Sequence, residues 1–169
     1  RAMVGAPATD QRLLSELKAV DNLYPLFGTL TQSSSQGSGN SLQALLTNRA
    51  GDFGALVEPT LLDRLEVKIG DSLKIGGLRL EIRGVIASEP DKASQGMSLG
   101  PRVIISTKAL QATGLVQPGS LLRYHYRLAL NKETSIADFR EDAKLSMSEA
   151  GWRITDSSNG APGIRRFVE

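Results

Sequence analysis

Residues 96–100 (GMSLG) have the G-x-S-x-G spacing of the nucleophile elbow of serine hydrolases. In those enzymes a strand precedes the serine and a helix follows it, so that the hydroxyl is exposed on a strained turn. Here a polar stretch precedes Ser98, and Pro101 and an expected strand follow it. The base would have to be His125, the only histidine, and nothing in the sequence brings it to Ser98. A serine hydrolase is therefore the least favoured alternative.

A second constellation is the R-x-H-x-R stripe of Arg123, His125 and Arg127 on one face of an expected strand. Side chains on one face recur about every 7 Å along a strand, so these cations could line up against an anion or a nucleic acid. The tyrosines of this strand fall on the opposite face, whereas single-strand binding surfaces combine cations with stacking aromatics. One alternative is therefore a nucleic-acid-binding barrel that uses Arg79 and Arg83 together with Arg123 and Arg127. Our preferred interpretation involves no nucleic acid.

No metal or nucleotide site is predicted. The chain has no cysteine, and neither residues 89–91 (EPD) nor residues 141–142 (ED) lie in an EF-hand-like frame. Neither the P-loop pattern nor G-x-G-x-x-G occurs. We therefore expect no catalytic residue, no cofactor and no metal ligand.

The composition is that of an ordinary globular chain, with 40% hydrophobic and 22% charged residues among 169. The formal net charge of +2 is too small to indicate a nucleic-acid partner by itself. No run of about 18 apolar residues occurs, so no spanning helix is expected. The first residue is Arg1 and not Met, which suggests a processed or excised piece.

Residues 61–86 are expected to build the core. Pro59 suits the first position of a helix, because it lacks the N–H that a helix start leaves unpaired. Residues 70–71 (GD) supply a turn and residues 76–77 (GG) a hairpin loop. In the strand that follows, one alternate set is expected to be buried and the other mostly wet. The buried set is Leu78, Leu80, Ile82, Gly84 and Ile86, and the wet set is Arg79, Glu81, Arg83 and Val85.

The remaining elements are less uniform. Residues 13–20 fit a helix slightly better than a strand, and residues 24–28 resemble an edge strand. Flexible or contact loops are expected at residues 31–41 and 88–101. Further strands are expected at residues 55–58, 103–105, 121–130 and 152–155, with helices at residues 108–113 and from Ser135 to Gly151. Residues 121–156 would form a parallel strand–helix–strand unit.

A resemblance to a known family adds to this pattern. Several segments follow one another as they do in FtsX-like ABC transporter permeases, and the similarity covers nearly all of the chain. The segments are residues 18–21 (KAVD), 24–28 (YPLFG), 65–71 (LEVKIGD), 84–86 (GVI), 89–91 (EPD), 99–103 (LGPRV), 113–115 (TGL), 118–120 (PGS), 160–163 (GAPG) and 166–168 (RFV). The last two are similar to the segment before that group's second membrane span.

The resemblance implies an α+β, two-lobed MacB-like periplasmic core domain. Residues 1–48 and 120–158 would form a discontinuous βαβ-type lobe that lacks its first strand and helix. Residues 49–119 would form an inserted β-rich lobe, and residues 159–169 would lead into a transmembrane helix. The resemblance also makes residues 13–20 a strand, and we follow it.

The function that the resemblance implies is mechanical. The chain would be the periplasmic domain of a bacterial inner-membrane permease that passes ATP-driven motion to lipids, lipoproteins, other hydrophobic molecules or periplasmic proteins. ATP would be hydrolysed by a separate cytoplasmic subunit, and a second permease copy or a homologous permease is a further expected partner. Exposed residues of the polar loop are candidate partner contacts, namely Glu89, Asp91, Met97 and Leu99.

Overall fold

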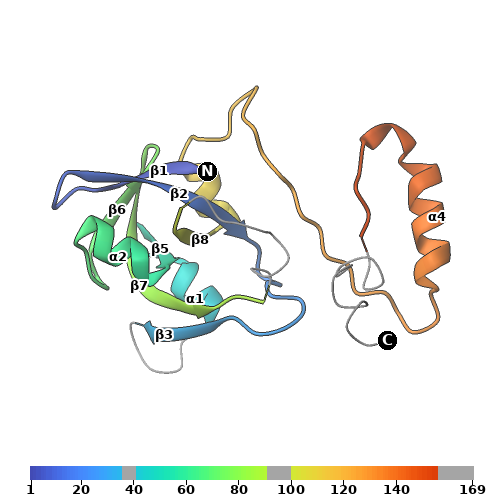
Figure 1. Cartoon of the computed structure of the whole chain (residues 1–169), viewed down its shortest axis with the longest axis horizontal. Coiled ribbons are helices and arrows are strands. Elements are labelled where there is room, and N and C mark those ends of the chain that lie inside the picture. Colours follow the sequence, from blue (N-terminus) through green and yellow to red (C-terminus); the bar gives the residue numbers. More distant parts are fainter. Residues whose placement is uncertain (36–40, 91–99, 156–169) are drawn as a thin grey trace, which may run out of the picture. The chain divides into compact units, whose positions relative to one another are not determined.

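The computed structural model describes residues 1–35, 41–90 and 100–155 and divides the chain into two compact units, Arg1–Tyr124 and His125–Glu169 (Figure 1). The first unit holds all the strands found in the described residues. They are β1 (Ala2–Ala6), β2 (Gln11–Val20), β3 (Thr31–Ser35), β4 (Asn48–Arg49), β5 (Asp52–Val57), β6 (Ser72–Ile75), β7 (Leu78–Ser88) and β8 (Arg102–Ser106).

Six of these strands close into a barrel. The sheet has the order β3-β7-β6-β1-β2-β8-β5-β4, and an additional pairing of β7 with β5 joins the ends of its six central strands. The β2–β8 and β5–β7 pairs are parallel, and the other pairs are antiparallel. The strands β3 and β4 extend β7 and β5 outside the ring. The described chain is therefore a mixed α+β structure centred on a closed six-stranded barrel.

The barrel strands β5 and β8 are buried on both faces. Ala55 and Val103 belong to one apolar cluster, while Leu56 and Ile104 belong to a second cluster that includes Leu45 of α1 (Leu42–Leu46). The helix covers the outer face of these strands. This explains why their sequences are continuous apolar runs and do not alternate.

The core-building stretch forms as predicted. The helix α2 (Pro59–Leu65) begins with a proline and ends at Glu66 in the left-handed conformation, and β6 and β7 form the expected hairpin. Gly76 has φ +58° in the connecting turn. The strand predictions at residues 13–20, 55–58 and 103–105 are confirmed by β2, β5 and β8. The helix at residues 108–113 is also confirmed, as α3 (Thr107–Ala112), and Ser106 caps it.

The expected alternation along β7 is wrong beyond Ile82. The register with β5 passes from Ala55 opposite Ile82 to Leu56 opposite Gly84, so Arg83 is the extra residue of a β-bulge. Arg83 and Val85, expected to be wet, are buried. A bulge shifts the side-chain phase of a strand, which a period-two pattern cannot anticipate.

Four other strand and loop predictions fail. Residues 24–28 form a turn with a cis Tyr24–Pro25 bond, and residues 31–35 form β3 where a loop was expected. Residues 121–130 and 152–155 are not strands, and no described strand pairs with them. Alternation marks an amphipathic segment, but a strand also needs a neighbour for its N–H and C=O groups. The polar β3 forms because its one neighbour, β7, supplies that ladder.

The expected boundary between the two lobes can be compared with the strand pairing. The strands β1 and β2 pair with β6 and β8, so the boundary between residues 48 and 49 falls inside one sheet. The compact units separate after Tyr124. Residues 156–169, which include the expected lead-in to a membrane helix, lie outside the described residues.

The second unit is built around α4 (Ile136–Ser146). Ser135 caps the helix, since its Oγ accepts a hydrogen bond from the Asp138 N–H at 3.5 Å. A short 3₁₀ turn (Ser148–Ala150) follows, and Gly151 has φ +63°. Among the described residues, no helix is both long and apolar enough to cross a bilayer.

Candidate functional site

The structure describes only part of the predicted site. Glu89 is placed at the end of β7, whereas Asp91, Met97 and Leu99 lie outside the described residues. Glu89 is only 7% exposed, so its side chain offers little surface to a partner. Its carboxylate is instead the centre of a set of charged and polar side chains.

Three groups donate hydrogen bonds to the Glu89 carboxylate. They are the Lys18 ammonium, the Tyr24 hydroxyl at 3.0 Å and Arg102 Nη1 at 3.2 Å. Arg102 Nη2 also lies 3.2 Å from the Glu16 carboxylate. We call these five residues, Glu16, Lys18, Tyr24, Glu89 and Arg102, the neck network.

The barrel topology brings the neck network together. Glu16 and Lys18 lie two residues apart on β2, so their side chains share one face of the strand. Arg102 begins β8 and is the register partner of Glu16 in the parallel β2–β8 pair. Glu89 directly follows β7. Glu89 precedes residues 91–99 in the sequence and Arg102 follows them, and the two side chains form an ion pair.

The network is costly to break. The side chains of Glu89 and Arg102 are 2% and 3% exposed, and a buried charge that loses its partner remains uncompensated. Arg102 Nε is buried and has no hydrogen-bond partner among the described residues. Pairing with two carboxylates offsets the desolvation of the guanidinium, which ties the position of Arg102 closely to both.

An exposed apolar turn lies next to this network. It consists of residues 22–27, and its large side chains Leu23, Leu26 and Phe27 are 74%, 37% and 54% exposed. We call it the apolar turn. Large apolar side chains grouped in one short turn are a feature of contact surfaces.

The apolar turn is held by side chains on both sides of it. Asp21 Oδ1 accepts hydrogen bonds from the N–H groups of Leu23 and Tyr24 at 3.0 and 3.1 Å. Gln43 Nε2, on α1, donates to the carbonyls of Asn22 and Tyr24 at 3.0 and 2.9 Å. The Tyr24 hydroxyl lies in the neck network, and the Lys18 ammonium is 4.2 Å from the centre of its ring.

The far end of the turn is fixed by close packing. Gly28 has φ +74°, and a Cβ placed there would lie 2.7 Å from Cβ of Pro90. Only glycine fits both the conformation and the space. The turn is therefore attached to β2, α1 and the end of β7.

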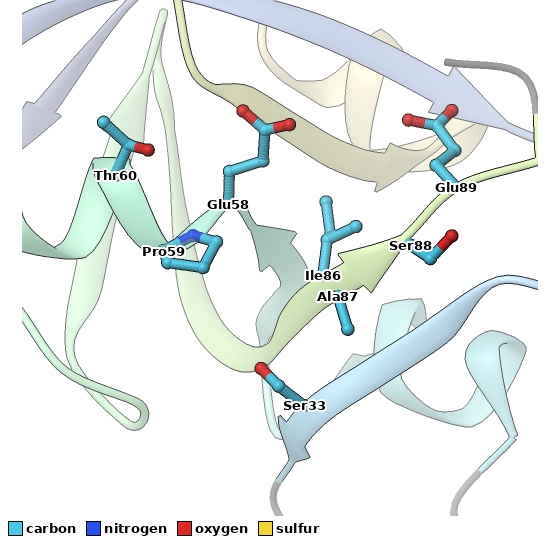
Figure 2. Close-up of a pocket in the computed structure, with 8 residues that line it drawn as sticks. All are labelled: Ser33, Glu58, Pro59, Thr60, Ile86, Ala87, Ser88 and Glu89. Carbon is cyan, nitrogen blue, oxygen red and sulfur yellow. The ribbon is translucent and has the colours of Figure 1, made fainter. Parts of the chain in front are cut away.

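Two hollows flank this region. The first has a volume of about 260 Å³ and is lined by Glu58 and Glu89, among others. Figure 2 shows the two carboxylates on either side of Ile86, pointing in the same direction. Glu58 accepts a hydrogen bond from the Arg102 N–H at 3.0 Å, so both carboxylates are engaged in structure. The second hollow, of about 460 Å³, lies beside Asp21 and Gln43. Its other lining residues are Val20, Asn22, Leu46, Thr47, Asn48, Phe53, Ser106, Thr107 and Lys108.

The described residues form no site for a serine hydrolase or for nucleic-acid binding. Ser98 lies outside the described residues, so its pairing with His125 has no geometry to describe. Arg83, assigned to a nucleic-acid surface, is fully buried, and its guanidinium donates to the carbonyls of Leu45, Thr47 and Asp52. In the parts of the chain that the structure describes, no three His, Asp or Glu side chains are grouped to hold a metal ion.

Comparison with known proteins gives one partial match. The chain is 33% identical over 125 residues to the uncharacterized ABC transporter permease YbbP of Escherichia coli (strain K12). The match covers 74% of this chain and 14% of that permease. No family model matches the chain, and no solved structure matches it. The similarity supports a relationship between this chain and the ABC transporter permeases.

Proposed function

We propose that this chain is part of the extracytoplasmic domain of an ABC transporter permease. The domain, of the MacB-like periplasmic type, belongs to a bacterial inner-membrane protein and has no catalytic activity of its own. It transmits the ATP-driven motion of the membrane helices to a lipid, a lipoprotein, another hydrophobic molecule or a periplasmic protein. A cognate cytoplasmic ATPase and a second permease copy or homologous permease complete the transporter.

The attachment of the apolar turn to the barrel is the observation that carries this proposal. An element that transmits motion has to move as a unit and to present a surface to whatever it moves. The ring of paired strands provides the rigid body, because each central strand has a neighbour on both sides. The turn provides the surface, and the neck network joins it to β2, β7 and β8.

The predicted contacts of segment 91–99 belong to this proposal as well. Asp91, Met97 and Leu99 are proposed as partner contacts, while the Glu89 side chain is held by Arg102 and Lys18. The similarity to a permease supports the assignment to a transporter.

Motion can be measured without knowing the cargo. The full-length permease would be reconstituted with its ATPase in lipid nanodiscs, with a donor fluorophore on D63C, an exposed position of α2, and acceptor-labelled lipids. Energy transfer should differ between the nucleotide-free and the vanadate-trapped states. An ATPase subunit unable to bind ATP should abolish the difference. Identical energy transfer in every nucleotide state would overturn the mechanical role.

The location can be tested separately. This chain contains no cysteine, so an impermeant maleimide applied to whole cells would report on D63C with no background from this domain. Labelling in intact cells is expected for D63C. The matched control L61C, fully buried on the same helix, should be labelled only after denaturation. Labelling of D63C only after the inner membrane is opened would place the domain in the cytoplasm.

A further inference from the structure

We infer that the apolar turn inserts its Leu23 and Phe27 side chains into the hydrocarbon of a bilayer surface. The ligand is the outer layer of a phospholipid membrane, contacted from the side and not crossed. This inference rests on the similarity to a membrane permease and not on the proposed transmission of motion, so each can fail without the other.

The first observation behind it is the absence of charge. Residues 22–30 (NLYPLFGTL) contain no Asp, Glu, Lys, Arg or His. Asp21, which directly precedes the turn, accepts hydrogen bonds from its backbone through Oδ1, and the buried Glu89 carboxylate accepts one from the Tyr24 hydroxyl. A charged side chain in the turn would oppose entry into hydrocarbon, and here none has to be moved.

The second observation is that four backbone groups in the first half of the turn, residues 22–24, have partners within the protein. The N–H groups of Leu23 and Tyr24 and the carbonyls of Asn22 and Tyr24 are all hydrogen-bonded to Asp21 or Gln43. Pro25 has no N–H to satisfy. Hydrocarbon offers neither donors nor acceptors, so these internal hydrogen bonds lower the cost of bringing residues 22–24 to the edge of the hydrocarbon.

These two observations favour a lipid surface over a protein partner. A protein interface forms about one hydrogen bond per 100–200 Å² and usually carries polar groups at its rim. In the apolar turn these four backbone groups are already hydrogen-bonded to Asp21 and Gln43, and the exposed side chains are those of Leu23, Leu26 and Phe27. Three apolar side chains held on a fixed frame also lose little conformational freedom on insertion.

The test uses fluorescence quenching at one position. Bimane would be attached to L23C in the full-length permease, in nanodiscs of phosphatidylethanolamine and phosphatidylglycerol that contain nitroxide-labelled acyl chains. The matched control is L14C, a half-exposed leucine on β2 whose cross-strand neighbour Met3 is also exposed. We expect the nitroxide lipids to quench bimane at position 23 and iodide in the water to quench it at position 14.

Each other outcome overturns the inference. Iodide quenching at both positions, without lipid quenching, would mean that the turn is in water. Protection of position 23 from both quenchers would mean that protein covers it. Lipid quenching that persists in detergent with one equivalent of nitroxide lipid would indicate a single bound lipid molecule in place of a bilayer surface. Leu23 is exposed, so its substitution should leave the barrel folded, which circular dichroism would verify.

Discussion

The Glu89 carboxylate lies 3.2 Å from Arg102 Nη1, and this buried ion pair joins the residue after β7 to the first residue of β8. The two strands are not neighbours in the sheet, since β5 pairs with both of them. The ion pair therefore connects two strands on opposite sides of β5. Its strength can be measured directly.

Replacing Glu89 by alanine should lower the free energy of unfolding by about 3 kcal/mol, because Arg102 and Lys18 lose a shared buried partner. Urea unfolding followed by circular dichroism would measure the loss. Asp63→Ala, on the exposed side of α2, is the control and should change stability by less than about 0.5 kcal/mol. Equal midpoints for the two variants would show that the buried pair contributes nothing.

Arg83→Met should lower the free energy of unfolding at least as much as Glu89→Ala. It would leave the carbonyls of Leu45, Thr47 and Asp52 without their buried donor, at a cost of about 3–5 kcal/mol. Arg79→Met, on the exposed part of the same strand, is the matched control and should be nearly neutral. Thermal melting of both proteins would separate them, and a small shift for Arg83→Met would contradict the structural role of this side chain.

Replacement by alanine should destabilise the protein at Gly54 but not at Gly5. A Cβ at Gly54 would lie 1.8 Å from the Leu45 carbonyl oxygen, so α1 would have to move away from β5. At Gly5 the nearest atom would be 3.8 Å away, an ordinary contact. Gly54→Ala is expected to cost about 3 kcal/mol by overpacking, and Gly5→Ala to be tolerated. A stable Gly54→Ala protein with unchanged amide spectra around α1 would refute this packing.

Asp21 should control the order of the apolar turn. In Asp21→Ala the N–H groups of Leu23 and Tyr24 lose their acceptor, worth about 1 kcal/mol, and their hydrogen exchange should become faster. Asp21→Asn keeps a side-chain oxygen and should restore slow exchange. Amide exchange by NMR or mass spectrometry would report both. If Asn fails to restore protection where Asp provides it, the carboxylate has a role beyond accepting these bonds.

Local patterns predicted the parts of the fold that depend on near neighbours. Pro59 marked the start of α2, residues 76–77 marked the β6–β7 hairpin, and Ser135 marked the start of α4. Each of these signals acts within a few residues of its own position. These elements can therefore be predicted from the local sequence alone.

Features that depend on distant segments were not predictable in this way. The bulge at Arg83 exists because β7 has to pair with β5, and residues 121–130 alternate without a described strand to pair with. Glu89 looked like an exposed loop residue because its partners Lys18 and Arg102 come from two other strands. The one hint in the sequence is that the charged residues Glu16 and Lys18 lie two apart, on one face of the strand at residues 13–20. Residues 24–28 resemble an edge strand in the sequence, but they form a turn.

The parallel pairing of β2 with β8 has a consequence for how the barrel assembles. Glu16 and Arg102 are 86 residues apart in the chain, and the ring is incomplete until such pairs have formed. Contacts between distant residues require long loops to close first, so folding should be slow for a domain of this size. During synthesis the ring cannot close before residue 106 leaves the ribosome. Until then β2 has an unpaired edge that a chaperone or a misfolded neighbour could occupy.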